Sequence, residues 1–363
     1  GAYQGIGPFG TYDMAGNVRE WTVNALDADR RFILGGASRS PTYLYADPEA
    51  LSPFDRSPEN GIRCVRNVTP LTADVTAAIK PLERDFASYR PASDEVFHAY
   101  QREYAYNKLP LNAKVDTIAS DSKDWRKEKI TFDAAYGGER MSAYLFIPAN
   151  VRPPYQAVIF FPSARVADIP TSRTLGDVDF FDYIVQSGRA VLYPVYKGLY
   201  ERRRSGAETG ASQPLDVKIQ RSRDVGRSLD YLQSRADIAG DKLAYLGVSM
   251  GSAEGVIYAT LAQDRLKTVV LLDGGYFLGA PPAGADQADF APRLKIPVLM
   301  VNGRFDFTFS YEKSQLPLFR ALGTPAADKD HLVLDTPHDV RARRAQLVPA
   351  VLGWLDKYLG RVQ

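Results

Sequence analysis

The sequence predicts an α/β protein whose main part is a doubly wound, mostly parallel sheet, preceded by a smaller loop-rich segment. From about residue 118 onward, short apolar runs alternate with helical patterns, as in sheets whose strands are joined by helical crossovers. These runs are continuous rather than alternating, which is typical of strands buried on both faces. Residues 1–67 are instead rich in Gly, Pro, Asp and Arg, which indicates a compact unit made mostly of loops.

The first predicted strands form a hairpin, 129–132 and 142–147, around the turn at Gly137 and Gly138. Buried strands are then predicted at Ala157–Phe161, Ala190–Pro194, Leu243–Leu246, Thr268–Leu272, Val298–Val301 and His331–Leu334. Helical spacing of apolar residues follows at Phe180–Ser187, Gln220–Ser234, Ser252–Gln263, Glu312–Leu322 and Arg341–Leu359.

A connector lies between the two parts. Apolar residues have helical spacing over 71–82 and again over 94–106, where Asp94 is the expected N-cap. We therefore divide the chain into a loop-rich segment at 1–68, a helical connector at 69–117 and a main domain at 118–363.

Composition excludes several functions. The 45 basic and 43 acidic residues leave a net charge of +2, so nothing favours nucleic acid or an anionic membrane as partner. The single cysteine, Cys64, excludes a disulfide within the chain and a cysteine-based metal site. Because no run of about eighteen apolar residues exists, we expect no membrane insertion. The first residues resemble the interior of a domain, so we expect Gly1 to lie within a longer polypeptide.

The motif Gly247-Val248-Ser249-Met250-Gly251 follows a predicted strand and precedes a predicted helix. In this G-x-S-x-G context a sharp turn presents the serine hydroxyl at the carboxyl edge of the sheet, and the turn tolerates only small close neighbours. We predict that Ser249 is a nucleophile and that the Met250 N–H is one oxyanion donor.

A serine nucleophile needs a base, and the chain has three histidines. His98 lies in the connector, and His331 begins a strand and so lies at the wrong edge of the sheet. His338 follows the last strand, in the loop before the final helix. Since ligands bind at the carboxyl ends of parallel strands, His338 is the predicted base.

The predicted acid is Asp306, in the loop after strand 298–301, because the order Ser249, Asp306, His338 is that of the α/β-hydrolases. Asp273, after strand 268–272, is the rival acid. The second oxyanion donor should follow strand 157–161. Pro162 has no N–H, so Ser163, Ala164 or Arg165 must donate, and the register favours Ala164.

Some side chains near these loops are candidates for substrate binding. Arg165 and the basic run at 202–204 could bind a substrate carboxylate, although a solvated charge run is the simpler interpretation. Tyr276 and Phe307 could line an acyl or aromatic pocket, and core packing explains them equally well.

Through Gly247–Gly251, Asn302–Asp306 and His338, residues 118–363 resemble the dienelactone-hydrolase and acyl-peptidase-like branch of the α/β-hydrolases. This resemblance implies hydrolysis through an acyl-enzyme, with a small-molecule ester as substrate and without a catalytic cofactor. Dienelactone hydrolases proper use cysteine as nucleophile, and Ser249 here indicates ordinary esters. A peptidase of the acylaminoacyl or prolyl-oligopeptidase kind and a non-catalytic module are the alternatives.

Residues 9–66 resemble the C-terminal part of a formylglycine-generating, sulfatase-modifying domain, through Tyr12–Trp21, Leu34–Gly36 and Gly61–Cys64. The resemblance implies a structural calcium held by side-chain and backbone oxygens of Asp13, Gly16, Val18 and Glu20. The family's catalytic cysteine pair would fall between residues 36 and 61, where this chain has no cysteine, so we expect a non-catalytic segment.

The pairing of these two parts resembles the tails of bacterial serine/threonine kinase fusions. That resemblance implies the rest of a kinase polypeptide as a partner, and it leaves open whether the chain lies in the cytoplasm or outside a membrane-anchored kinase. No kinase motif occurs in these 363 residues, and the sequence leaves the oligomeric state open.

Overall fold

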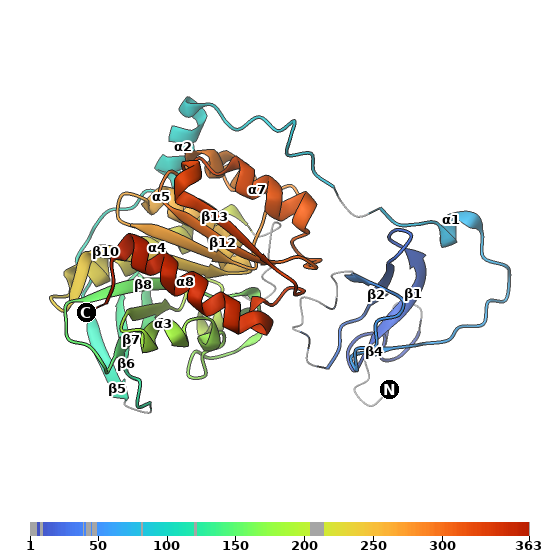
Figure 1. Cartoon of the computed structure of the whole chain (residues 1–363), viewed down its shortest axis with the longest axis horizontal. Coiled ribbons are helices and arrows are strands. Elements are labelled where there is room, and N and C mark those ends of the chain that lie inside the picture. Colours follow the sequence, from blue (N-terminus) through green and yellow to red (C-terminus); the bar gives the residue numbers. More distant parts are fainter. Residues whose placement is uncertain are drawn as a thin grey trace. The chain divides into compact units, whose positions relative to one another are not determined.

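The computed structural model of the chain describes residues 6–7, 10–38, 40, 45, 49–80, 83–119, 122–203 and 214–362. It divides into two compact units, Gly1–Glu83 and Arg84–Gln363 (Figure 1). The boundary falls inside the predicted connector 69–117, because helix α2 (Asp94–Tyr104) packs on helix α4 (Leu215–Ser234) of the larger unit. Phe97 and Tyr104 of α2 are buried, and the rings of both lie against the ring of Phe290.

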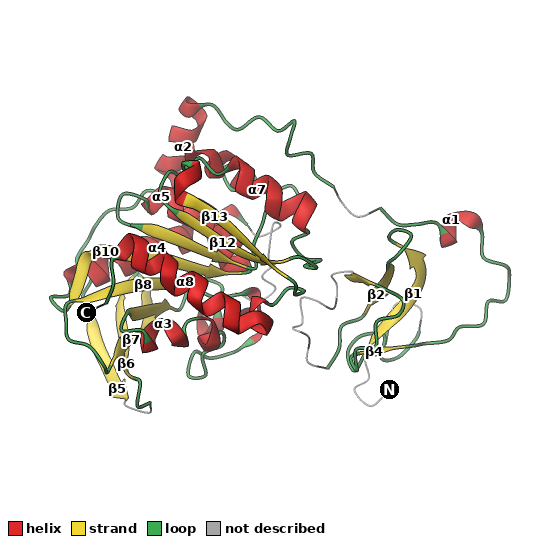
Figure 2. Ribbon diagram, viewed as in Figure 1, coloured by secondary structure: helices red, strands yellow, loops and turns green. Residues whose placement is uncertain are grey.

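The larger unit is built on a nine-stranded sheet (Figure 2). Its strands lie in the spatial order β13 (Lys329–Leu334), β12 (Val298–Gly303), β11 (Thr268–Leu272), β10 (Ile238–Val248), β8 (Tyr155–Phe161), β9 (Ala190–Pro194), β7 (Arg140–Pro148), β6 (Trp125–Asp133) and β5 (Lys114–Ala119). The strands from β13 to β9 are parallel, whereas β7, β6 and β5 are antiparallel to their neighbours. The predicted doubly wound, mostly parallel sheet is confirmed.

Helices cover both faces of this sheet. Helix α3 (Asp182–Gln186) and helix α8 (Arg344–Leu359) pack on the front face in Figure 1, and α4 and helix α5 (Met250–Ala262) pack behind it. Strands β8, β9 and β11 are buried along their whole length, which is why they are continuous apolar runs in the sequence. The predicted helix over 312–322 is divided into a π turn at Tyr311–Gln315 and helix α7 (Leu316–Ala321).

Some local predictions were wrong. Strand β5 was not predicted, because it is an exposed edge strand that mixes charged and apolar residues. The helix expected over 71–82 is only the single turn α1 (Ala73–Thr76), which buries no residue and so lacks the packing that stabilises a helix. Asp94 is not the N-cap of α2; Ser93 is, and its hydroxyl accepts the Val96 N–H.

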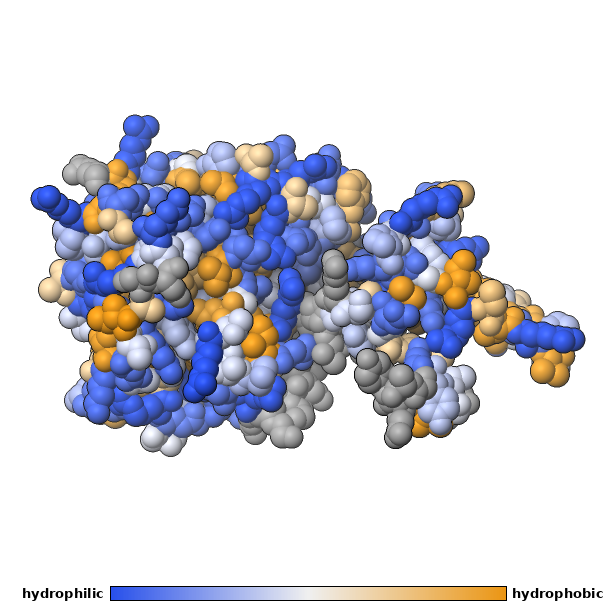
Figure 3. Space-filling model, turned by 90° about the horizontal axis from the view of Figure 1, so that it is seen from below, coloured by the Kyte–Doolittle hydropathy of each residue, from blue (hydrophilic) through white to orange (hydrophobic). Residues whose placement is uncertain are grey.

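The smaller unit holds a four-stranded sheet in the order β3 (Glu49–Leu51), β2 (Arg31–Leu34), β1 (Arg19–Ala25) and β4 (Asn60–Gly61). Its strands are short, and Phe32 and Ile33 of β2 are its buried apolar centre. Outside these strands the unit is mostly loop, as its composition predicts. None of the helices in the described part of the chain combines the length and apolar character needed to cross a bilayer. Figure 3 shows hydrophobic residues in several separate patches among hydrophilic residues on the face in view.

Candidate active site

Ser249 lies in the sharp turn between β10 and α5, at the carboxyl edge of the sheet. Its backbone has φ 52° and ψ −109°, which non-glycine residues rarely adopt. The neighbouring glycines are required by space. A Cβ at Gly247 would lie 2.1 Å from the Gly251 oxygen, and one at Gly251 would lie 2.3 Å from the Phe161 oxygen. The small neighbours predicted from the motif thus hold the serine in this strained turn.

The structure brings Ser249, His338 and Asp306 together in one chain of hydrogen bonds. Ser249 Oγ is 2.9 Å from His338 Nε2, and His338 Nδ1 is 2.7 Å from Asp306 Oδ2. Because an ionised carboxylate can only accept, Nδ1 is assigned the proton, which leaves Nε2 to accept from the serine hydroxyl. Ser249 and Asp306 are buried, and His338 is partly exposed. The geometry is that of a serine–histidine–acid triad.

The loops that carry His338 and Asp306 are bonded to each other. Phe305 N–H donates to the Thr336 oxygen at 3.0 Å, and Arg304 N–H donates to the Leu334 oxygen at 2.7 Å. The second oxygen of Asp306 accepts the Phe309 N–H at 2.9 Å. Both loops are therefore held as one unit, and the Asp306 carboxylate is fixed from two sides.

Asp273 also lies beside the imidazole, since ligand atoms of Asp273, Asp306 and His338 all fall within 4.8 Å of one another. Its Oδ2 accepts the Val340 N–H at 3.0 Å, whereas its buried Oδ1 has no hydrogen-bond partner among the described residues. Burial raises the pKa of Asp273 to about 7. Of the two acids that the sequence left open, Asp306 bonds the imidazole and Asp273 bonds the loop beyond it.

Burial alone would lower the pKa of His338. The charge of Asp306 and its hydrogen bond outweigh this effect, with a further contribution from Asp273, and raise the pKa of His338 to about 9. His331, in β13, is not near this group: its Nε2 lies 3.1 Å from Asn302 Oδ1, and burial lowers its pKa to about 4.

The two predicted oxyanion donors have suitable surroundings. Met250 is the first residue of α5, where backbone N–H groups have no partner within the helix. In the loop after β8, Ser163 N–H donates to Asp177 Oδ2 and Arg165 N–H donates to Ser163 Oγ. Among the described residues the Ala164 N–H has no hydrogen-bond acceptor. Of the three candidates, Ala164 is therefore the one whose N–H can donate to a substrate oxygen.

The predicted substrate-binding residues differ in exposure. Arg165 is exposed beside the oxyanion loop, and Phe307 is half-buried after Asp306. Tyr276 is only 2% exposed and stacks on Phe86 at 4.3 Å, which favours the packing interpretation of its ring. Neither interpretation of the basic run holds for Arg202: it bonds the fully buried Asp224 at 2.7 Å, inside the larger unit. Arg204 lies outside the described residues.

Arg221 and Glu254, which were not predicted as site residues, form a fully buried ion pair at 3.0 Å, and Glu254 lies in the helix that follows Ser249. Arg221 Nη1 also lies 3.5 Å from Met250 Sδ, so this pair supports the residue that follows Ser249. A signal was present in the sequence, since α4 and α5 carry charged residues on faces that must pack against the sheet.

The predicted calcium ligands of the smaller unit are joined by an arginine. Arg63 Nε donates to the Glu20 carboxylate at 2.8 Å, and Arg63 Nη2 donates to the Asp13 carbonyl oxygen at 2.8 Å. The Arg63 guanidinium thus already binds the oxygens of two residues that were predicted to hold the calcium ion. Calcium binding at Asp13, Gly16, Val18 and Glu20 stays a prediction, and it requires Arg63 to move.

Residues 4–68 match the model of the sulfatase-modifying factor enzyme 1-like domain. No match was found among curated protein sequences.

Solved structures resemble the larger part of the chain. Acetyl xylan esterase from Paenibacillus sp. R4 is 17% identical with a TM-score of 0.57, over 75% of this chain and 98% of that one. Acetyl xylan esterase 1 from Thermoanaerobacterium sp. is 15% identical with a TM-score of 0.54, and the match covers 72% of this chain and 95% of that one. A putative dipeptidyl aminopeptidase IV from Bacteroides ovatus is 16% identical with a TM-score of 0.53, and the match covers 66% of this chain and 36% of that one. At these identities the likeness shows the fold: the chain joins a sulfatase-modifying factor enzyme 1-like segment to a unit with the α/β-hydrolase fold.

Proposed function

We propose that the larger unit is a serine hydrolase that cleaves carboxylic esters through an acyl-enzyme. The hydrogen-bonded chain from Ser249 through His338 to Asp306, at the carboxyl edge of the sheet, carries this proposal. The strained backbone at Ser249 supports it, since such strain concentrates at functional sites.

In the first half-reaction, Ser249 Oγ attacks the ester carbonyl carbon while His338 Nε2 takes the hydroxyl proton. Asp306 holds the imidazole by its Nδ1–H and stabilises the imidazolium that forms. The N–H groups of Met250 and Ala164 stabilise the negative charge on the carbonyl oxygen. His338 then gives its proton to the leaving alkoxide, the bond to the alcohol breaks, and the acyl group stays on Ser249.

In the second half-reaction, His338 takes a proton from water, and the resulting hydroxide attacks the acyl carbon. The same two N–H groups stabilise the second tetrahedral intermediate. When the bond to Oγ breaks, His338 returns its proton to Ser249, and the free acid leaves.

We favour esters over peptides as the substrate class. The acetyl xylan esterases that share the fold align over nearly their whole length, whereas the aminopeptidase aligns over 36% of its chain. The same triad serves amide cleavage, so a peptidase is the second candidate. Efficient cleavage of peptide p-nitroanilides with feeble cleavage of p-nitrophenyl esters would reverse this order.

The direct test uses Ser249→Ala. Turnover of short-chain p-nitrophenyl esters should fall by roughly 10⁶, to the rate left by the oxyanion donors alone. A fluorophosphonate probe should label the wild-type chain at Ser249 and leave Ser249→Ala unlabelled. A folded wild-type chain that refuses the probe would support the non-catalytic module instead.

A further inference from the structure

Lys218 lies in the first turn of α4, is 1% exposed, and takes no part in the proposed chemistry. Its Nζ is buried and has no hydrogen-bond partner in the part of the chain that the structure describes. A buried ammonium is normally paired, because an unpaired charge loses its hydration without compensation. This side chain therefore has an unused donor in an interior position.

Lys218 belongs to the edge of the sheet that carries the triad. Helix α4 follows the carboxyl end of β9, and Phe277 lies in the loop after β11, beyond Asp273. Lys218 Nζ is 5.4 Å from the centroid of the Phe277 ring. That ring lies 5.6 Å from the Phe309 ring, which lies 5.8 Å from the His338 ring.

A second path leads from Lys218 to the nucleophile turn. Arg221, one helical turn further along α4, contacts both Glu254 and Met250 Sδ. Lys218 is thus connected to the residue after Ser249 through one neighbour and to the imidazole through two aromatic rings. Of the two rings, Phe309 is 2% exposed, whereas Phe277, the ring next to the ammonium, is half-buried and is the one with apolar surface to offer a hydrocarbon chain.

The acids near Lys218 already have partners. Burial lowers the pKa of Lys218, while Glu254 and Asp286 act in the opposite direction and Arg221 adds to the lowering. Glu254 is held by Arg221 and accepts the Tyr258 hydroxyl at 2.7 Å. Asp286 is paired with Arg84 and caps helix α6 (Gln287–Phe290) by accepting the Ala288 N–H. Neither acid makes a hydrogen bond to the ammonium, so a ligand acceptor would complete the site.

We propose that Lys218 binds the free carboxylate of an ester substrate, so that the preferred substrates are half-esters of dicarboxylic acids. The inference rests on the proposed ester hydrolysis and adds the substrate class. A carboxylate matches the ammonium in charge and accepts a charge-assisted hydrogen bond. The methylene groups between the carboxylate and the ester carbonyl would lie against the half-buried Phe277 ring.

The experiment compares p-nitrophenyl monoesters of succinate, glutarate and adipate with neutral acyl esters of matched length. In the wild-type chain at least one anionic ester should have a higher kcat/KM than its neutral match. Lys218→Met should lower that ratio by roughly ten- to hundredfold, as expected for loss of a hydrogen bond to a charged group. Lys218→Arg should keep part of the preference, because it keeps the charge.

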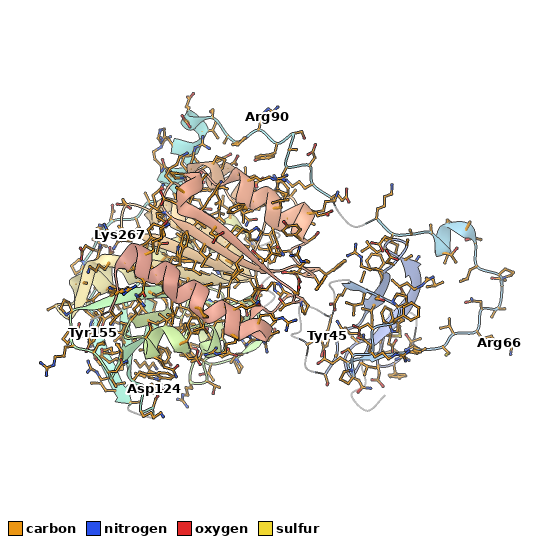
Figure 4. All side chains as sticks on the ribbon, in the orientation of Figure 1. Tyr45, Arg66, Arg90, Asp124, Tyr155 and Lys267 are labelled. Carbon is orange, nitrogen blue, oxygen red and sulfur yellow. The ribbon has the colours of Figure 1, made fainter. Side chains whose placement is uncertain are left out.

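Lys267→Met is the matched control. Lys267 (labelled in Figure 4) is exposed and precedes β11, so it lies at the opposite edge of the sheet, and its loss should leave the ratio unchanged. Equal kcat/KM for every anionic and neutral pair in the wild type, or the same ratio in Lys218→Met, would overturn the proposal. Glutarate binding measured by calorimetry should weaken in Lys218→Met, and this readout does not depend on turnover. If esters are not cleaved but glutarate still binds through Lys218, the proposed function fails and the anion site stands.

Discussion

At the scale of single residues, two buried carboxyls face one imidazole, and the hydrogen bonds distinguish them. Asp306 accepts from His338 Nδ1, whereas Asp273 accepts from the backbone of Val340. Asp306→Asn should lower kcat by roughly 10³–10⁴, because an amide can present its N–H to Nδ1 and so stabilise the wrong tautomer. Asp273→Asn should lower kcat by less than about tenfold. Similar losses in the two variants, measured with one ester, would contradict this assignment.

The pH dependence follows from the same contacts. His338 must be neutral to take the serine proton, and its pKa is raised to about 9, so kcat/KM should rise with pH through the alkaline range. The carboxylate of Asp273 adds to this rise in pKa, so Asp273→Asn should move the acidic limb of the profile to lower pH. Profiles of both proteins with one ester test this, and an unmoved limb would count against the influence of Asp273.

The three triad residues could be predicted because each stands at a position that the alternation of strands and helices defines. Ser249 ends β10, Asp306 follows β12 and His338 follows β13. Lys218 could not be found in this way. Its isolation depends on which neighbours are already paired, and only the folded contacts between α4, α5 and α6 determine that. The interpretations of Arg202 as a carboxylate-binding or solvated residue were wrong for the same reason, because its partner Asp224 lies 22 residues further along the chain.

At the scale of elements, the turn between β10 and α5 depends on close backbone approach. Gly251→Ala should destabilise the chain by about 1–3 kcal/mol or more, because its Cβ would meet the Phe161 carbonyl, which cannot move away freely. Gly353→Ala, in α8, is the control, because a Cβ at that position meets nothing within 4 Å. This substitution should stabilise the chain by about 0.5–1 kcal/mol. Denaturant melts of both variants measure the difference.

Elements buried on both faces were predicted best. The bounds of β9 and β11 match the apolar runs residue for residue, because burial on both faces demands continuous apolar sequence. Elements without a buried face were missed, as with β5, or overextended, as with α1. For α1 the helical spacing was real, but none of its residues is buried, so apolar packing does not stabilise further turns.

At the scale of the whole molecule, the two units have separate cores, so calorimetry should resolve two unfolding transitions. If calcium binds Asp13 and Glu20, adding it should raise the midpoint of one transition, and a chelator should reverse the shift. Glu20→Gln should abolish the response while leaving the other transition in place. No response of either transition to calcium would instead favour Arg63 as the permanent partner of these oxygens.

The backbone at Ser249 has a consequence for the balance between activity and durability. A glycine adopts a φ of 52° without strain, whereas an alanine does not. The free energy of unfolding of Ser249→Gly should therefore exceed that of Ser249→Ala by about 1 kcal/mol, although both variants are inactive. Denaturant melts of the two variants would measure this difference in the free energy of unfolding. If the proposed chemistry were not needed, replacing this serine would therefore make the chain more stable, so the hydroxyl is kept at the expense of stability.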